Sequence, residues 1–164
     1  MKIKEVLSAL ERFAPLPLQE GWDNAGLQIG LTEAEVSGAL LCLDVNESIV
    51  DEAIEKGCNL IVSHHPLLFK GLKTISDGDY VQRTVMKAIF NRIAIVSMHT
   101  NMDNAKGGVN YKIADHLGLH DVEFFAEKPG NVEAGSGVVG LLPEPMSATA
   151  FIQLVKERFI IATI

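Results

Sequence analysis

The chain has 164 residues, the length of one ordinary domain, and its 48% hydrophobic and 21% charged residues are typical of a folded globular protein rather than a disordered one. The formal net charge of −7 argues against nucleic acid as the main partner, because such binding depends on clustered Lys and Arg. The first residues do not resemble a signal peptide, and no run approaches the ~18 to 20 apolar residues of a membrane span, so a soluble cytoplasmic protein is expected. The two cysteines form no C-x-x-C pair, and buried, reduced thiols are expected.

The first predicted element is an amphipathic helix. Apolar residues recur at helical spacing over about residues 2–13, and Pro15 and Pro17 are expected to end the helix. The stretch GWDNAGLQIG, residues 21–30, is expected to form a loop. The first part of the chain therefore predicts one helix and irregular backbone before the first strand.

Apolar strands and amphipathic helices alternate through the rest of the chain. Asn46 and Ser147 are expected to cap helix N-termini, and Gly57 and Gly118 are expected to end helices. Strands that are apolar throughout and separated by helices predict an α/β fold, with a mostly parallel sheet and helices on both faces. The strands are expected near residues 38–43, 59–63, 92–98, 122–126 and 137–142.

One segment, EKPGNVEAGSG at residues 127–137, has the composition of a linker. We therefore predict an N-terminal α/β metal-binding domain over residues 1–126 and the start of a second α/β subdomain over residues 127–164. After the last predicted helix the chain stops in IIATI, residues 160–164, which has the pattern of a buried strand. This apolar ending predicts that the second subdomain is truncated.

The residues with the clearest chemistry follow the ends of three predicted strands. Asp44 follows the first strand, the pair His64 and His65 follows the second, and His99 follows the third. Ligands of open parallel sheets bind beyond the carboxyl ends of the strands, and neighbouring strands lie about 4.8 Å apart, so these groups can converge. Imidazole is a common ligand of transition metals, which favours a metal site over a pair of polar loop histidines.

Asp103 belongs to the same predicted loop as His99, in the segment MHTNMDNAKGGVN. Its carboxylate can bridge two cations, and His99 can act as a third imidazole ligand or as a partner that orients a ligand. A surface turn rich in Asn and Asp is the alternative. Together with His64 and His65, this segment favours a metal site.

Trp22, Asp23 and Asn24 lie in the segment GWDNAGLQ. Asp23 and Asn24 can orient metal ligands or substrate, or they can form a turn that caps the preceding loop, and the structural role is favoured. The chain contains no G-x-S-x-G, P-loop or G-x-G-x-x-G motif, so the corresponding hydrolase, NTPase and dinucleotide-binding chemistries are not indicated.

Three segments in this order, GWDNAGLQ, SHHP after a buried strand, and HTNMD followed by GGVN, resemble the GTP cyclohydrolase I type 2 homologue family, also called the Nif-three-like family. The resemblance covers roughly residues 1–145. It implies an α/β fold with a pair of divalent ions, a toroidal homohexamer, and a metal site that includes His64, His65, His99 and Asp103. It also implies a C-terminal His and Glu, spaced four apart, that complete the site, and no such pair follows residue 145.

The favoured hypothesis for function is a dinuclear metal-dependent hydrolase that acts on a small nucleotide-like substrate, because two close ions can activate a water molecule. The family name implies opening of the guanine ring of GTP. A non-catalytic metal-binding scaffold or regulatory protein is the alternative. A metallophosphoesterase of another family ranks third, because its additional Asp/His and Asn-His signatures are not found. The ligand types do not distinguish Zn, Fe, Mn, Co and Ni.

Overall fold

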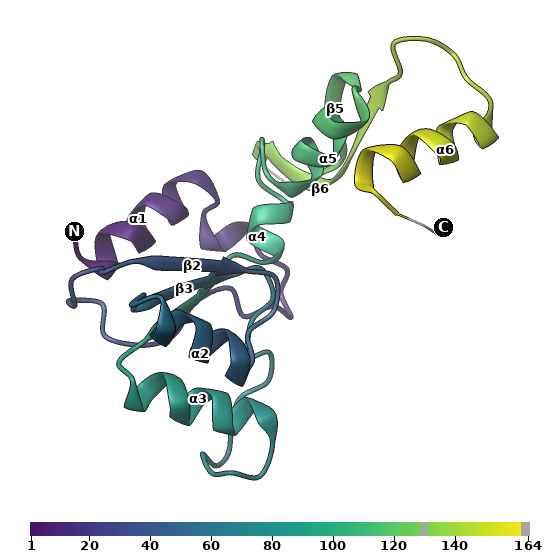
Figure 1. The fold of residues 1–164 in the computed structure, drawn as a ribbon. Helices are drawn as coiled ribbons and strands as arrows, with labels where there is room; N and C mark the ends of the chain where they lie inside the picture. The colour runs from purple at the N-terminus through teal and green to yellow at the C-terminus, as the bar shows by residue number, and fades with distance from the viewer. Residues whose placement is uncertain (129–130, 162–164) are drawn as a thin grey trace. The chain divides into compact units, whose positions relative to one another are not determined.

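The computed structural model describes residues 1–128 and 131–161, and it divides into two compact units, Met1–Met102 and Asp103–Ile164. Each unit has a sheet of its own (Figure 1). The boundary predicted after residue 126 falls within strand β5 (His120–Lys128) of the second unit. No helix in the described part of the chain is long and apolar enough to cross a membrane.

The first unit is built on a sheet of four strands. They are β1 (Gly26–Ile29), β2 (Ala39–Cys42), β3 (Leu60–Ser63) and β4 (Ala94–Ser97). The order across the sheet is β1-β4-β3-β2, in which β2, β3 and β4 run parallel and β1 runs antiparallel to β4. The α/β fold with a mostly parallel sheet, predicted from the apolar strands, is therefore confirmed.

Strand β1 lies within the stretch that was expected to be a loop. Gly26, the first residue of β1, and Gly30, the residue after it, have φ angles of +97° and +119°, which favour glycine. A Cβ atom at Gly30 would lie 2.5 Å from the Cβ of Ala94, so the absence of a side chain lets the backbone pass close to β4. The prediction of a loop was wrong for residues 26–29, because a strand this short offers too few alternating residues to be recognised.

Helices cover both faces of this sheet (Figure 1). Helices α2 (Glu47–Glu55) and α3 (Tyr80–Phe90) lie on one face, and α1 (Ile3–Phe13) lies on the other.

Cys42 and Cys58 are free thiols that are half-buried against the core, rather than fully buried as expected. Burial of each large aliphatic side chain of this core contributes about 1.5–3 kcal/mol. The core under α2 and α3 includes Val50, Ala53, Ile61, Val85, Ala88 and Ile95.

Helix α2 begins after Asn46, the predicted N-cap. The Oδ1 atom of Asn46 accepts hydrogen bonds from the backbone N–H of Ile49 at 3.1 Å and from the hydroxyl of Ser48 at 2.6 Å. Because this cap satisfies an N–H group that lacks a partner within the helix, Asn46→Ala should lower the free energy of unfolding by about 1 kcal/mol, whereas Asn46→Ser should retain most of the stability. Urea denaturation of both variants measures this difference. Equal stability of the alanine and serine variants would contradict the capping role.

The described part of the second unit contains an antiparallel hairpin and two longer helices. Gly118 ends the first of these helices with φ +73°, and the Oγ atom of Ser147 caps the second by accepting a hydrogen bond from the N–H of Ala150 at 3.2 Å. Both roles were predicted from the residue types. The elements are α5 (Val109–Leu117), β5 (His120–Lys128), β6 (Asn131–Leu141) and α6 (Ala148–Phe159).

The glycine-rich stretch with the composition of a linker contributes to this hairpin. A Cβ atom at Gly135 would lie 2.6 Å from the carbonyl oxygen of Ala126 and 2.6 Å from Cγ of Phe124. Gly135 therefore allows β6 to pair closely with β5. Linkers and closely paired strands both use glycine, which explains why composition alone suggested a boundary here.

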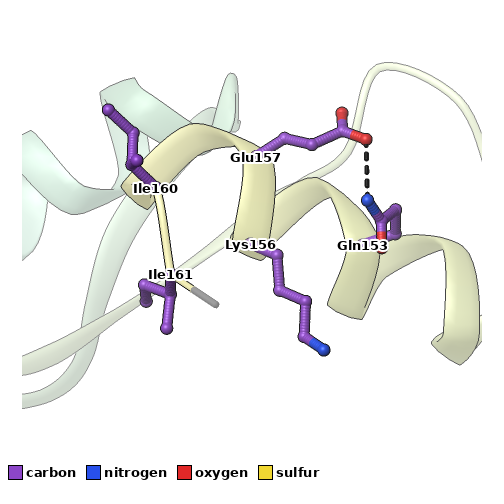
Figure 2. A pocket seen from close by; sticks show the side chains of 5 residues that line it. All are labelled: Gln153, Lys156, Glu157, Ile160 and Ile161. Atoms are coloured by element: carbon purple, nitrogen blue, oxygen red, sulfur yellow. Dashed lines mark hydrogen bonds between the residues drawn. The ribbon is translucent and has the colours of Figure 1, made fainter. Parts of the chain in front are cut away.

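Helix α6 has no buried residue, and a hollow lies at its C-terminal end (Figure 2). Within the hollow, Nε2 of Gln153 donates a hydrogen bond of 2.9 Å to Oε1 of Glu157. Ile160 ends the helix with φ +54°, and residues 162–164 of the predicted terminal strand lie outside the described residues. The lining residues are Gln153, Lys156, Glu157, Ile160 and Ile161, which include no histidine or cysteine.

Candidate metal centre

The parallel pairing of β3 and β4 brings the predicted histidines to one edge of the sheet. His64 and His65 follow β3 directly, and His99 follows shortly after β4. The last residues of these strands, Ser63 and Ser97, are partners in the register. One ligand atom from each of the three histidines lies within 4.8 Å of the others. These three side chains, the histidine cluster, can therefore hold a metal ion.

Hydrogen bonds fix the backbone that carries His64 and His65. Their N–H groups donate to carbonyl oxygens at the end of β2 and just beyond it, at 3.1 Å and 2.9 Å. The hydroxyl of Ser63 lies 2.9 Å from the carbonyl oxygen of His65 and 2.9 Å from the hydroxyl of Ser97. Because both serines are almost fully buried, these contacts hold the turn in place at the strand ends.

Each imidazole of the histidine cluster has its Nδ1 atom beside a hydrogen-bond acceptor. An acceptor at Nδ1 places the proton there and the lone pair on Nε2, the tautomer that binds metals through Nε2. The ring centroids lie 5.0, 5.2 and 5.5 Å apart. The chemistry of this donor set therefore fits a divalent transition metal. The Nδ1 contacts are His64 to the carbonyl oxygen of Met98 at 2.9 Å, His65 to Oδ1 of Asp44 at 2.8 Å and His99 to Oδ1 of Asp23 at 2.8 Å.

Asp23, the partner of His99, has a fully buried side chain. It also accepts hydrogen bonds from the N–H of Asn24 at 2.7 Å, from the N–H of Thr100 at 3.1 Å and from the Thr100 hydroxyl. Burial alone would raise the pKa of Asp23, but the hydrogen bonds from His99, Thr100 and Asn24 outweigh burial and hold this pKa below its ordinary value. Of the two roles that the sequence left open for Asp23, its contact with His99 supports the orientation of a ligand.

Asp44, the partner of His65, is far more accessible than Asp23. Its side chain is 68% exposed, against 0% for Asp23. Water competes for an exposed carboxylate, so Asp44 should orient its imidazole less firmly. A hollow of about 370 Å³ borders this pair, and its lining includes Asn46 and Tyr80. The cluster is therefore open to small molecules on the side of His65.

Asp103, the fourth predicted ligand, ends the short helix α4 (Thr100–Asp103), which starts directly after His99. The N–H of Met102 donates to the carbonyl oxygen of His99 at 2.8 Å, which closes the turn. Asn101 is fully buried and donates its side-chain N–H to the carbonyl oxygen of Ala14 at 2.8 Å. Asp103 is not one of the three residues whose ligand atoms cluster, so its role as a ligand stays a prediction.

The sequence profile of the Duf34/NIF3 (NGG1p interacting factor 3) family matches residues 1–164, the whole chain. The chain belongs to the NIF3 family. A relative from Clostridium acetobutylicum, named GTP cyclohydrolase 1 type 2 homolog, is 38% identical over 160 residues, which make up 97% of this chain and 60% of the relative. The family resemblance inferred from the three motifs is therefore confirmed.

Solved structures of bacterial proteins share this fold. A hypothetical protein of Staphylococcus aureus matches with a TM-score of 0.92 and 29% identity, over 99% of this chain and 66% of that one. A Bacillus cereus protein related to NIF3 matches with a TM-score of 0.73 and 43% identity, over 78% of this chain and 35% of that one. The chain thus spans less than two thirds of the length of these relatives.

Proposed function

We propose that this NIF3 protein binds a pair of divalent metal ions and acts as a hydrolase on a small nucleotide-like molecule. The observation that carries the metal site is that the Nδ1 atom of each imidazole in the histidine cluster lies 2.8 or 2.9 Å from an acceptor oxygen, which leaves Nε2 as the ligand atom. The proposed ligands are His64, His65, His99 and Asp103.

The residues of the chain have separate tasks in this proposal. The Nε2 atoms of the histidine cluster and the carboxylate of Asp103 would hold the ions. Asp23 and Asp44 hold the imidazoles of His99 and His65 in the required orientation, through their hydrogen bonds to Nδ1. Divalent ions bound there would activate a water molecule at neutral pH and polarise the bond under attack.

The substrate class of the proposal rests on the relatives, several of which carry the name GTP cyclohydrolase 1 type 2 homolog. Hydrolysis of the guanine ring of GTP releases formate, which gives a direct assay. The purified full-length protein loaded with Zn²⁺, Fe²⁺, Mn²⁺, Co²⁺ or Ni²⁺ should release formate from GTP, and the same protein without metal should not.

Formate release that does not exceed the metal-free control, for any of these metals, would remove GTP as the substrate. Tight metal binding without hydrolysis of nucleotides, phosphoesters or cyclic amides would contradict the hydrolase and favour a metal-binding scaffold. The predicted homohexamer is tested separately by the molar mass of the protein in solution.

A further inference from the structure

Two large aromatic side chains are exposed beside the histidine cluster. Trp22 is 61% exposed and Phe69 is 48% exposed, and their ring centroids lie 5.9 Å apart with an angle of 55° between the ring planes. The ring of Trp22 also contacts His99 edge to face, with centroids 6.1 Å apart. Trp22 and Phe69 therefore form an aromatic wall that borders the candidate metal centre.

The loops that carry this aromatic wall are joined by hydrogen bonds. The side-chain N–H of Asn24 donates to the carbonyl oxygen of Leu68 at 2.7 Å, and Oε1 of Gln28 accepts from the N–H of Leu68 at 3.1 Å. Asp23, the residue after Trp22, is anchored by its buried side chain. These contacts hold the backbone next to Trp22 and Phe69 in place, so the two aromatic side chains are exposed to solvent at defined positions.

We propose that the aromatic wall stacks against the planar ring of the small molecule that binds at the histidine cluster, so that Trp22 and Phe69 select aromatic or heteroaromatic substrates. This inference rests on the proposed metal site and adds the residues that recognise the ring. Stacking requires a flat π-face and few hydrogen bonds, which suits two exposed aromatic side chains. A ring on this wall lies next to His99, because Trp22 contacts both Phe69 and His99.

Trp22 is the single tryptophan of the chain, so its fluorescence reports directly on the wall. The zinc-loaded chain is titrated with GMP, AMP and UMP, which carry planar rings, and with ribose 5-phosphate, which has the sugar and phosphate without a ring. At least one mononucleotide should quench Trp22 fluorescence in a saturable way, and ribose 5-phosphate should not. Absence of quenching by all three mononucleotides would overturn the proposal.

Variants at Phe69 keep the Trp22 signal and test stacking itself. Phe69→Ala should weaken binding of the quenching mononucleotide by roughly 5- to 100-fold, and Phe69→Tyr should restore it. Phe90→Ala is the matched control, because Phe90 is 78% exposed at the end of α3, and it should bind as the unaltered chain does. Unchanged affinity in Phe69→Ala, or equal losses in Phe69→Ala and Phe90→Ala, would contradict the inference.

Two further measurements separate this inference from its competitors. The visible absorption of bound Co²⁺ should be the same in the Phe69 variants and the unaltered chain, and lack of Co²⁺ binding by the unaltered chain would contradict the metal site instead. A Trp22 spectrum that shifts with protein concentration in the absence of nucleotide would show that a second copy of the chain covers the wall, which would overturn a role in substrate binding.

Discussion

Replacing His99 by alanine should weaken the binding of a divalent ion at least 100-fold. Loss of a residue that only orients a ligand typically costs about 10- to 100-fold in affinity, so loss of the ligand itself should cost more. The variant keeps His64 and His65, whose ring centroids lie 5.0 Å apart, but it lacks the third imidazole of the cluster. Titration with Co²⁺ against a chromophoric chelator measures the affinity, and elemental analysis after dialysis measures the metal that is retained.

His120→Ala is the matched control for this experiment. His120 begins β5, its side chain is 52% exposed, and its Nδ1 lies 2.9 Å from Oδ2 of Asp121, so the same atoms are removed outside the cluster. This control should bind Co²⁺ as the unaltered chain does. Circular dichroism of both variants establishes that they are folded. A folded His99→Ala variant with unchanged affinity would remove His99 from the metal site.

The parallel core of the fold could be predicted from the sequence because its signals are local. The parallel strands contain continuous apolar runs such as LIV at residues 60–62, and Asn46 and Gly57 mark the two ends of the helix between β2 and β3. Strand β1 could not be predicted in this way. This strand depends on pairing with β4, and Gly30 lies so close to the backbone of Ala94 that a side chain at this position would clash with it. That contact is set by the tertiary structure and leaves no local periodicity.

The position of the histidine cluster could also be predicted, because parallel strands end at the same edge of a sheet. The partners that orient the rings were harder to identify. Asp23 and His99 are separated by 76 residues, and Asp44 and His65 by 21. One feature of the sequence indicated Asp44, because this residue follows the end of a predicted strand. The partner of His64 is the backbone carbonyl of Met98, and a backbone partner cannot be predicted from the residue type.

The different burial of Asp23 and Asp44 ranks the two carboxylates. An ionised, fully buried carboxylate that accepts several hydrogen bonds has a single arrangement of lowest energy, whereas an exposed carboxylate exchanges its partner with water. His99 should therefore be held more rigidly than His65. Removal of the negative charge should affect metal binding more at Asp23 than at Asp44.

Replacing Asp23 by asparagine should lower the affinity for Co²⁺ by about 10- to 100-fold. The carboxylate accepts hydrogen bonds from His99, Asn24 and Thr100. In asparagine, an NH₂ group replaces one of the two carboxylate oxygens, so this donor would face one of the donors that now bind Asp23. The unmatched donors should also lower the free energy of unfolding by about 1–3 kcal/mol at neutral pH. Asp44→Asn, the matched control, should show a smaller change in both quantities, because its side chain is 68% exposed.

The dependence on pH gives a second test of Asp23→Asn. The pKa of Asp23 is lowered in the folded chain, so its ionised form stabilises the fold above the pKa of the unfolded chain, about 3.9. This contribution is lost as the pH falls through that value toward the lower folded pKa. The stability difference between the unaltered chain and Asp23→Asn should therefore be largest near neutral pH and shrink below about pH 4. Urea denaturation across this range measures it, and a difference that stays constant with pH would show that the charge of Asp23 does not stabilise the fold.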